Sequence, residues 1–325
     1  GIIINKFRGD AALFADGVRF LAERTGIPVL GVLPFLRDLA LDQEDSLDVD
    51  GQQQVAFQPD RINIAVVLLP HMSNFTDFNA LADEPDVSLR YVSTPEAAVG
   101  ADAIVLPGSK TTLADLAYLR GKGFEALLRV HVQRGGELVG VCGGYQMLGR
   151  QIADPDAVES GGIGEGFGFL QVTTVLMREK ITEQVEGRAI HLDGSATVPV
   201  RGYFIHMGRT DRHAHRPCFE VQGTVNSFDG RAEATEREPV SFDGAVSDDG
   251  LVWGTYIHGL FDEPLCRRTW LNRLRTRKGL PVADLAASQQ VNQQRVDALD
   301  RWADHVQQHL DLTSIWELLR HGKTA

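Results

Sequence analysis

The sequence predicts an α/β protein built on a mostly parallel sheet. Short apolar runs rich in β-branched residues alternate with amphipathic segments of helical period, and Gly or Pro separates most of them. Such alternation is typical of strand–helix–strand units, whose strands run parallel. Hydrophobic residues make up 43% of the 325 residues and charged residues 23%, so the chain can bury the cores of two domains.

The strand–helix alternation occurs twice along the chain. The first series consists of expected strands at Ile2–Ile4 and Val29–Leu33, with a helix over Ala11–Arg24 between them. The second series follows an acidic, Gln-rich stretch and has expected strands at Ile62–Leu69, Val87–Val92, Ala103–Leu106 and Glu137–Val141. After Phe169 the pattern changes to short β-like runs, and residues 263–325 have helical character again.

These changes in pattern predict four parts. We expect the end of one α/β domain over residues 1–50, a linker over 51–60, a second domain over 61–275 and a helical extension over 276–325. The chain begins without Met, inside an expected buried strand. We therefore expect it to be a piece of a longer protein.

Charge and composition argue against several classes of protein. The formal charge is −12, from 32 basic and 44 acidic residues, whereas nucleic-acid binding needs a basic surplus. No apolar stretch approaches the roughly 20 residues of a membrane helix, and the N-terminus is unlike a signal peptide. The three cysteines are widely spaced and lack a CxxC pair. We therefore expect no disulfide framework, no nucleic-acid or membrane partner, and a cytoplasmic location.

Cys142 is the first candidate functional residue. In Gly140-Val-Cys-Gly-Gly-Tyr-Gln146 the thiol follows an expected strand and precedes an expected helix, and small residues surround it. This pattern suits the sharp strand-to-helix turn that exposes a nucleophile. The helix N-terminus favours the thiolate, and N–H groups of the turn can hold an oxyanion. The alternative is a small buried cysteine at a strand end.

A nucleophilic thiol needs a base, and the chain has ten histidines. His258 ends an apolar strand and precedes a Gly, and strand ends are where α/β sheets present catalytic groups. A partly buried histidine with ordinary hydrogen bonds is the alternative. His206 has a similar position at a strand end. His213 and His215 lack the carboxylate or Cys pattern of a metal site, so no metal is expected.

Four motifs, taken in order, resemble one family. They are Val105-Leu-Pro-Gly-Ser-Lys110, Gly140-Val-Cys-Gly-Gly-Tyr-Gln146, Gly202-Tyr-Phe-Ile-His-Met-Gly-Arg-Thr210 and Tyr256-Ile-His-Gly-Leu-Phe261. Together they resemble the class I glutamine amidotransferases of the cobalamin pathway, and the third motif is similar to that of the cobyric acid synthases. Ile4-Asn-Lys-Phe-Arg-Gly-Asp10 resembles the end of the synthetase domain of these enzymes. The resemblance spans residues 1 to about 320.

The resemblance implies a fold and a reaction. Residues 61–275 would form a flavodoxin-like amidotransferase domain with a mixed, mostly parallel sheet. Residues 1–50 would be the C-terminal part of a P-loop, dethiobiotin-synthetase-like domain. Glutamine hydrolysis would supply ammonia to the ATP-activated b, d, e and g carboxylates of adenosylcobyrinic acid a,c-diamide. The implied partners are thus glutamine and a corrinoid, and homo-oligomerisation stays open.

The resemblance also implies roles for individual residues. Cys142 would form a glutamyl thioester, with His258 as its acid and base. The residues expected around the oxyanion and the substrate are Gly108, Gly143, Gln146, Tyr203 and His206. Asn5 would contact the adenine of ATP, although a turn-forming Asn fits equally well. No bound cofactor is expected in this chain, whereas ATP and Mg²⁺ are implied for the full-length enzyme.

The chain departs from the family pattern in three places. Leu260 stands where triad enzymes have a Glu two residues after the histidine, as is known for the cobalamin branch. The site is therefore expected to be a dyad without an acidic member, and what orients His258 stays open. Phe204 stands where the family often has Glu, which puts a polar role of that position in doubt. No Gly-x-x-x-x-Gly-Lys-Ser/Thr phosphate loop occurs, so the ATP site is incomplete.

Other functions stay open at this point. The nearest alternatives are cobyrinic acid a,c-diamide synthase and a cell-wall amidotransferase subunit. A hydrolase or peptidase with a Cys elbow is a more distant one. A non-catalytic binding domain of the same fold is the alternative of another class, and Phe204 and Leu260 are its best evidence.

Overall fold

The computed structural model describes residues 1–10, 12–36, 55–192, 198–224 and 240–321. They belong to two compact units: Asp42–Val291, and Gly1–Leu41 together with Asn292–Ala325. The expected linker at 51–60 is described only from Val55 onwards, so the domain boundaries near it stay predictions.

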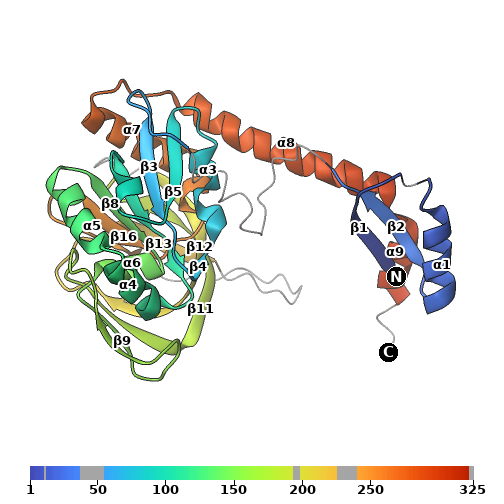
Figure 1. The fold of residues 1–325 in the computed structure, drawn as a ribbon, viewed down its shortest axis with the longest axis horizontal. Helices are drawn as coiled ribbons and strands as arrows, with labels where there is room; N and C mark the ends of the chain where they lie inside the picture. Colours follow the sequence, from blue (N-terminus) through green and yellow to red (C-terminus); the bar gives the residue numbers. More distant parts are fainter. Residues whose placement is uncertain (11, 37–54, 193–197, 225–239, 322–325) are drawn as a thin grey trace. The chain divides into compact units, whose positions relative to one another are not determined.

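The larger unit is built on a six-stranded sheet of largely buried strands (Figure 1). The strand order is β15–β16–β8–β6–β3–β5, and every neighbouring pair is parallel except β15 with β16. The strands are β3 (Ile62–Val67), β5 (Val87–Val92), β6 (Ala103–Leu106), β8 (Glu137–Val141), β15 (Ala245–Val246) and β16 (Val252–Thr255). The mixed, mostly parallel sheet expected from the sequence is confirmed.

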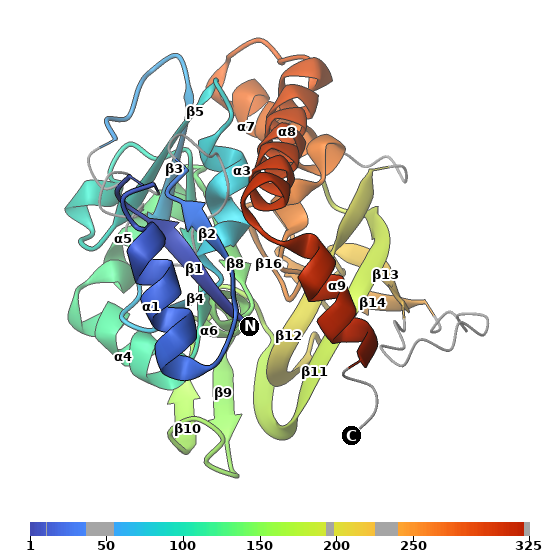
Figure 2. The ribbon, with the colours of Figure 1, turned by 90° about the vertical axis from the view of Figure 1, so that its right-hand side faces the viewer.

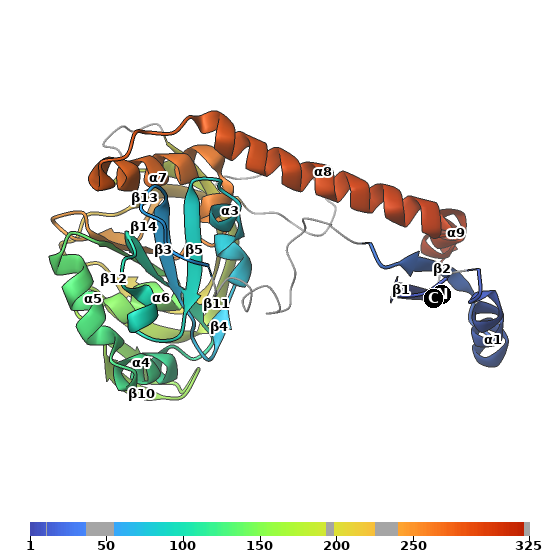
Figure 3. The ribbon, with the colours of Figure 1, turned by 45° about the horizontal axis from the view of Figure 1, so that its top comes forward.

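Helices cover both faces of this sheet, because parallel strands are buried on both sides. Figure 3 shows α4 and α5 on one side of the strands and α7 on the other. The helices of this unit are α3 (Asn79–Ala82), α4 (Thr112–Gly121), α5 (Phe124–Gln133), α6 (Gly143–Leu148) and α7 (Pro264–Lys278). Three short 3-10 helices complete it: η1 (Phe75–Phe78), η2 (Glu96–Ala98) and η3 (Leu260–Asp262).

A buried carboxylate holds α7 against the sheet. Glu137 in β8 is fully buried, and one of its oxygens accepts hydrogen bonds from the indole nitrogens of Trp253 and Trp270, each at 2.6 Å. The same carboxylate forms ion pairs with Arg273 and Arg277 of α7. A carboxylate is stable in the interior only when it is paired and fully hydrogen-bonded, so these contacts fix where α7 lies.

A second sheet lies beside the first and contains two long strands. β11 (Thr173–Ala189) pairs antiparallel with β12 (Pro199–Asp211), and both are visible in yellow-green in Figure 2. The other strands are β9 (Gln151–Asp154), β10 (Gly162–Glu165), β13 (Phe219–Thr224) and β14 (Ser241–Asp243). β4 (Met72–Ser73) and β7 (Gly108–Ser109) form a separate short ladder. Most of the short β-like runs of the sequence thus lie in β11, β12 and β13, whereas the run at 251–257 contains β16 of the first sheet.

The smaller unit is formed by segments from both ends of the chain. β1 (Ile2–Phe7) and β2 (Val29–Pro34) are parallel, with α1 (Ala15–Thr25) between them, as the sequence predicts. α8 (Leu285–His309) begins in the larger unit and ends in the smaller one, which also contains α9 (Leu312–His321). Gly31 forms a β-bridge with Leu310. The sequence did not indicate this pairing of the terminal helices with the first strands.

Across the described ranges, none of the helices combines the length and apolar character that crossing a membrane requires.

Glu137→Ala tests the role of the buried carboxylate. The substitution leaves two arginines and two indole N–H groups without their shared partner, so we expect the free energy of unfolding to fall by about 3–5 kcal/mol. Urea denaturation measures this change. Glu125→Ala is the control, because Glu125 forms partly exposed ion pairs worth about 1 kcal/mol or less. Equal losses in the two variants would contradict the assignment.

Candidate active site

Cys142 occupies a sharp turn between β8 and α6. Its backbone dihedrals are φ 52° and ψ −110°, a conformation that residues other than Gly rarely adopt. Such strain costs about 1–3 kcal/mol and is retained chiefly at functional sites. The side chain is 7% exposed, and its sulfur lies 4.0 Å from the carbonyl oxygen of Ile205. The strand, turn and helix expected around the thiol are therefore all present.

Close packing explains the glycines around Cys142. A Cβ on Gly144 would lie 1.9 Å from the carbonyl oxygen of Leu106 at the end of β6. A Cβ on Gly143 would lie 2.9 Å from the backbone nitrogen of Ser109. Both contacts are too close for any other residue, since the atoms met belong to backbone. The turn is thus pressed against the loop that follows β6.

His258 lies just after β16 and is fully buried. Its backbone pairs with that of Tyr203 in β12 through two N–H···O bonds of 2.9 and 3.1 Å. Its Nδ1 lies 2.7 Å from Oδ2 of Asp77, and the other oxygen of Asp77 accepts a 2.9 Å bond from the N–H of Gly259. Asp77 therefore holds both the imidazole ring and the turn after it. Nε2 has no hydrogen-bond partner of normal geometry within the described part of the chain.

The surroundings of His258 favour its charged form. Burial of the ring opposes the charge, but the hydrogen bond with Asp77, the charge of that carboxylate and the nearby Cys142 sulfur raise the pKa from 6.5 to about 10. The ring is thus protonated at neutral pH. Because the folded-state pKa is raised, the stabilisation that this group contributes is complete below about pH 6.5 and is lost as pH rises towards 10.

Asp77 corrects the expected dyad. Leu260 suggested that the site has no acidic member, but Asp77 supplies one from η1, which is 181 residues before His258. Asp77 follows the carboxyl end of β3, and such ends meet at one edge of a parallel sheet. A carboxylate shortly after a predicted strand end is therefore the feature of the sequence that points to Asp77. Leu260 itself is buried in η3.

The other expected residues of the thiol site divide into two groups. Gly108 lies against the histidine, since a Cβ on it would be 3.4 Å from Cε1 of His258, and Gly143 lies against the loop after Gly108. Tyr203 stacks on His258 with ring centroids 5.4 Å apart, and its hydroxyl accepts a hydrogen bond from Asn74. These residues surround the thiol and imidazole. Their roles in binding stay predictions.

Gln146 and His206 meet at Tyr256 instead. Nε2 of Gln146 donates to the Tyr256 hydroxyl at 3.1 Å, and the His206 ring stacks on Tyr256 with centroids 3.9 Å apart. Burial lowers the pKa of His206 to about 4, so this ring is neutral. Within the described ranges, neither Gln146 nor His206 forms a hydrogen bond with the imidazole of His258.

The structure also shows the surroundings of Phe204 and Asn5, for which the sequence left the role open. Phe204 faces Glu183 directly across the β11–β12 ladder, so a carboxylate lies opposite the position where the resemblance expects one. Asn5 belongs to the smaller unit, where its side-chain oxygen accepts a hydrogen bond from the N–H of Lys6. That contact is the turn-forming arrangement, and contact with a nucleotide stays a prediction.

Over the described ranges, no three His, Cys, Asp or Glu side chains are grouped to hold a metal ion.

Comparison with known proteins identifies the family. The profile of the "CobB/CobQ-like glutamine amidotransferase domain" matches residues 63–265, which is more than half of the chain. The chain belongs to this amidotransferase family. Residues 63–265 contain the whole cluster of Cys142, His258, Asp77 and Gly108.

Several curated relatives of this amidotransferase carry one name. "Cobyric acid synthase" of Citrobacter koseri is 44% identical over 332 aligned residues, which cover 99% of this chain and 62% of that protein. Proteins of the same name from Salmonella dublin and Syntrophobacter fumaroxidans are 43% and 40% identical, cover 98% of this chain, and are matched over 61% and 62% of their lengths. The chain thus spans about three fifths of these relatives.

Asp77→Asn tests the pairing with His258. The variant keeps the shape of the side chain but removes the charge that favours the imidazolium, so we expect the pKa of His258 to fall by at least about one unit. NMR titration of the ring protons measures it. Asp115→Asn is the matched control, because Asp115 is a buried carboxylate that pairs with another histidine, His71. An unchanged titration of His258 in Asp77→Asn would contradict the pairing.

Proposed function

We propose that this chain hydrolyses glutamine at Cys142, and that the protein containing it uses the ammonia to amidate a corrin. The observation that carries the proposal is the buried contact of Asp77 with His258 beside the strained Cys142. A thiol on a tight turn, an imidazole beside it and a carboxylate that orients the imidazole form the set needed for acyl transfer through a thioester.

The reaction uses Cys142 as the nucleophile and His258 as the group that carries the proton. The Cys142 sulfur, as thiolate, attacks the side-chain carbonyl carbon of glutamine, and N–H groups of the turns at Gly108 and Gly143 stabilise the oxyanion. The imidazolium of His258 gives its proton to the departing nitrogen, which leaves as ammonia. A glutamyl thioester remains on Cys142, and His258 is neutral.

The second half of the reaction restores the site. Neutral His258 takes a proton from water as the oxygen attacks the thioester carbon. The tetrahedral intermediate collapses, the carbon–sulfur bond breaks, and glutamate leaves. Asp77 accepts the Nδ1 hydrogen bond throughout, which keeps Nε2 directed to the reacting atoms.

The acceptor is proposed from the relatives and the resemblance. Proteins that are 40–44% identical to this chain are named cobyric acid synthase. We infer that the ammonia reaches the b, d, e and g carboxylates of adenosylcobyrinic acid a,c-diamide and gives cobyric acid. Activation of these carboxylates would need ATP and Mg²⁺. The sequence has no phosphate loop for this ATP. We propose Asn5 as the residue of this chain that contacts its adenine base.

Two alternatives are affected differently by the site. The binding-domain alternative loses Leu260 as an argument, because Asp77 takes the place of the missing acid. Cobyrinic acid a,c-diamide synthase would use the same thiol chemistry on another acceptor. An acceptor assay of a longer protein that includes the ATP-dependent part separates the two, since only cobyric acid formation consumes the a,c-diamide.

Cys142→Ala tests the proposed hydrolysis. We expect the wild-type chain to release glutamate and ammonia from glutamine, and the variant to lose at least about a thousandfold in rate, because the nucleophile is absent. Coupled detection of glutamate measures the reaction. Cys266→Ala is the matched control, since Cys266 is a buried thiol in α7. Hydrolysis that survives in Cys142→Ala would refute the proposal.

A further inference from the structure

A closed ring of contacts surrounds the imidazole of His258. Its Nδ1 is bonded to Asp77, and the N–H of Asp77 donates a 3.1 Å bond to the carbonyl oxygen of Asn74. The side chain of Asn74 donates a 2.9 Å bond to the hydroxyl of Tyr203. Tyr203 then returns to His258 through both its ring and its backbone. Four residues from three segments that are far apart in the sequence therefore hold one another.

β12 reaches the histidine because Gly202 leaves room for it. A Cβ on Gly202 would lie 2.2 Å from the carbonyl oxygen of His258, so any other residue would push the strand away. With glycine at this position, the backbones of Tyr203 and His258 form an antiparallel bridge. β12 belongs to the second sheet, whereas His258 follows β16 of the first. The bridge therefore joins the two sheets at the candidate site.

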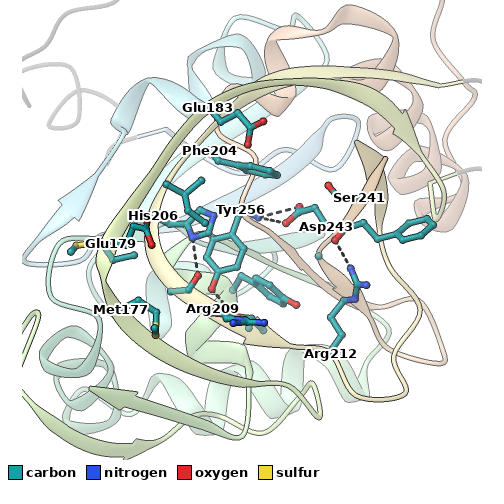
Figure 4. A pocket seen from close by; sticks show the side chains of 17 residues that line it. Met177, Glu179, Glu183, Phe204, His206, Arg209, Arg212, Ser241, Asp243 and Tyr256 are labelled. Carbon is teal, nitrogen blue, oxygen red and sulfur yellow. Dashed lines mark hydrogen bonds between the residues drawn. The ribbon is translucent and has the colours of Figure 1, made fainter. Parts of the chain in front are cut away.

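The alternation of side chains along β12 directs Tyr203 to the histidine. Successive side chains of a strand point to opposite faces. Phe204 and His206 line a pocket between β11, β12 and β14, as Figure 4 shows. Tyr203 points to the other face of the strand and packs on His258. One face of β12 thus borders the pocket, and the other borders the imidazole.

The stack on Tyr203 supplies a restraint that Asp77 alone does not. The bond at Nδ1 fixes one edge of the imidazole, but the ring can still tilt about that bond and move Nε2 away from Cys142. The Tyr203 ring lies against the face of the imidazole, with an interplanar angle of 24° and centroids 5.4 Å apart, so it opposes this tilt. Such a restraint matters for rate, because a misplacement of about 1 Å can cost about a hundredfold.

The backbone of Asn74 is shaped for its contact with Tyr203. Its dihedrals are φ 55° and ψ 51°, in the left-handed region that Asn adopts more readily than most residues other than Gly. Unusual backbone conformations of this kind persist where the surrounding structure requires them. Asn74 also precedes η1, the short helix that carries Asp77. It therefore connects the residue at the edge of the imidazole with the residue at its face.

We propose that Tyr203 is a positioning residue that holds the plane of the His258 ring, and that Asn74 locks Tyr203 in place. Tyr203 acts through His258, whereas the resemblance implied that it contacts the substrate. The docking of the second sheet on the first thus completes the candidate active site. This inference rests on the proposed glutamine hydrolysis.

Tyr203→Leu removes the stack and tests this role. We expect kcat for glutamine hydrolysis to fall about tenfold or more with KM little changed, because the imidazole tilts while the substrate site is kept. Glutamate release at varied glutamine concentration measures both constants. The proton between Nδ1 of His258 and Asp77 should also exchange faster with water, as measured by NMR. Tyr118→Leu is the matched control, since Tyr118 is a partly buried tyrosine of α4 that packs against the core, and it should change neither kcat nor the exchange rate.

Tyr203→Phe and Asn74→Gly test the lock and perturb the fold less than Tyr203→Leu. Phe keeps the aromatic stack, and Gly adopts the left-handed backbone of Asn74 without strain, so each variant removes one hydrogen bond. We expect each to lower kcat about two- to tenfold. The double variant should lower it no further, because both changes remove the same bond. This pair gives the answer if Tyr203→Leu does not fold.

The outcomes separate this inference from the function on which it rests. A raised KM with unchanged kcat in Tyr203→Leu would overturn the inference, since Tyr203 would then contact glutamine. Additive losses in the double variant would overturn the lock by Asn74. Either result, with Cys142-dependent hydrolysis intact, leaves the proposed function standing. Absence of that hydrolysis in the wild type would refute the proposed function, whereas proton exchange at His258 would still measure the restraint by Tyr203.

Discussion

The buried contact between Asp77 and His258 is the interaction on which the rest of the site depends. Asp77 is 4% exposed and His258 is not exposed at all, so neither can replace its partner with water. One carboxylate oxygen bonds the ring and the other bonds the N–H of Gly259, which fixes the imidazole and its turn together. Removing one member would leave an uncompensated buried charge. Asp77 thus fixes the position of His258 and also contributes to its raised pKa.

The parallel sheet is what makes this contact available. β16, β8, β6 and β3 are the four inner strands of the six-stranded sheet and lie next to one another in this order. Because they are parallel, their carboxyl ends meet at one edge of the sheet. Asp77, Gly108, Cys142 and His258 each follow one of these ends. Gly144 lets the turn at Cys142 approach the carbonyl of Leu106, which closes the cluster. The four residues of the candidate site therefore follow four different strands, and the order of the strands brings them together.

Local sequence patterns indicate a candidate residue when its neighbours in the chain form a recognisable motif. Cys142 lies among small residues after an apolar strand, and His258 ends another, so the sequence indicated the position of both, while the resemblance supplied their expected roles. Asp77 has only a weak signal, its position after the carboxyl end of β3, because its contact depends on a partner 181 residues away and on the order of the strands. The position of Glu183 opposite Phe204 depends on a register that shifts between Leu176 and Ile181, which no local pattern encodes. The packing of the terminal helices with β1 and β2 is likewise a tertiary property.

If Asp77 acts on the thiol only through His258, the effects of replacing the two residues on the alkylation rate of Cys142 are coupled, and a double-mutant cycle measures that coupling. Iodoacetamide labelling of Cys142 would be followed in the wild type, Asp77→Asn, His258→Gln and the double variant. We expect Asp77→Asn to slow labelling when His258 is present and to have no further effect when His258 is replaced. An equal effect of Asp77→Asn in both backgrounds would contradict it.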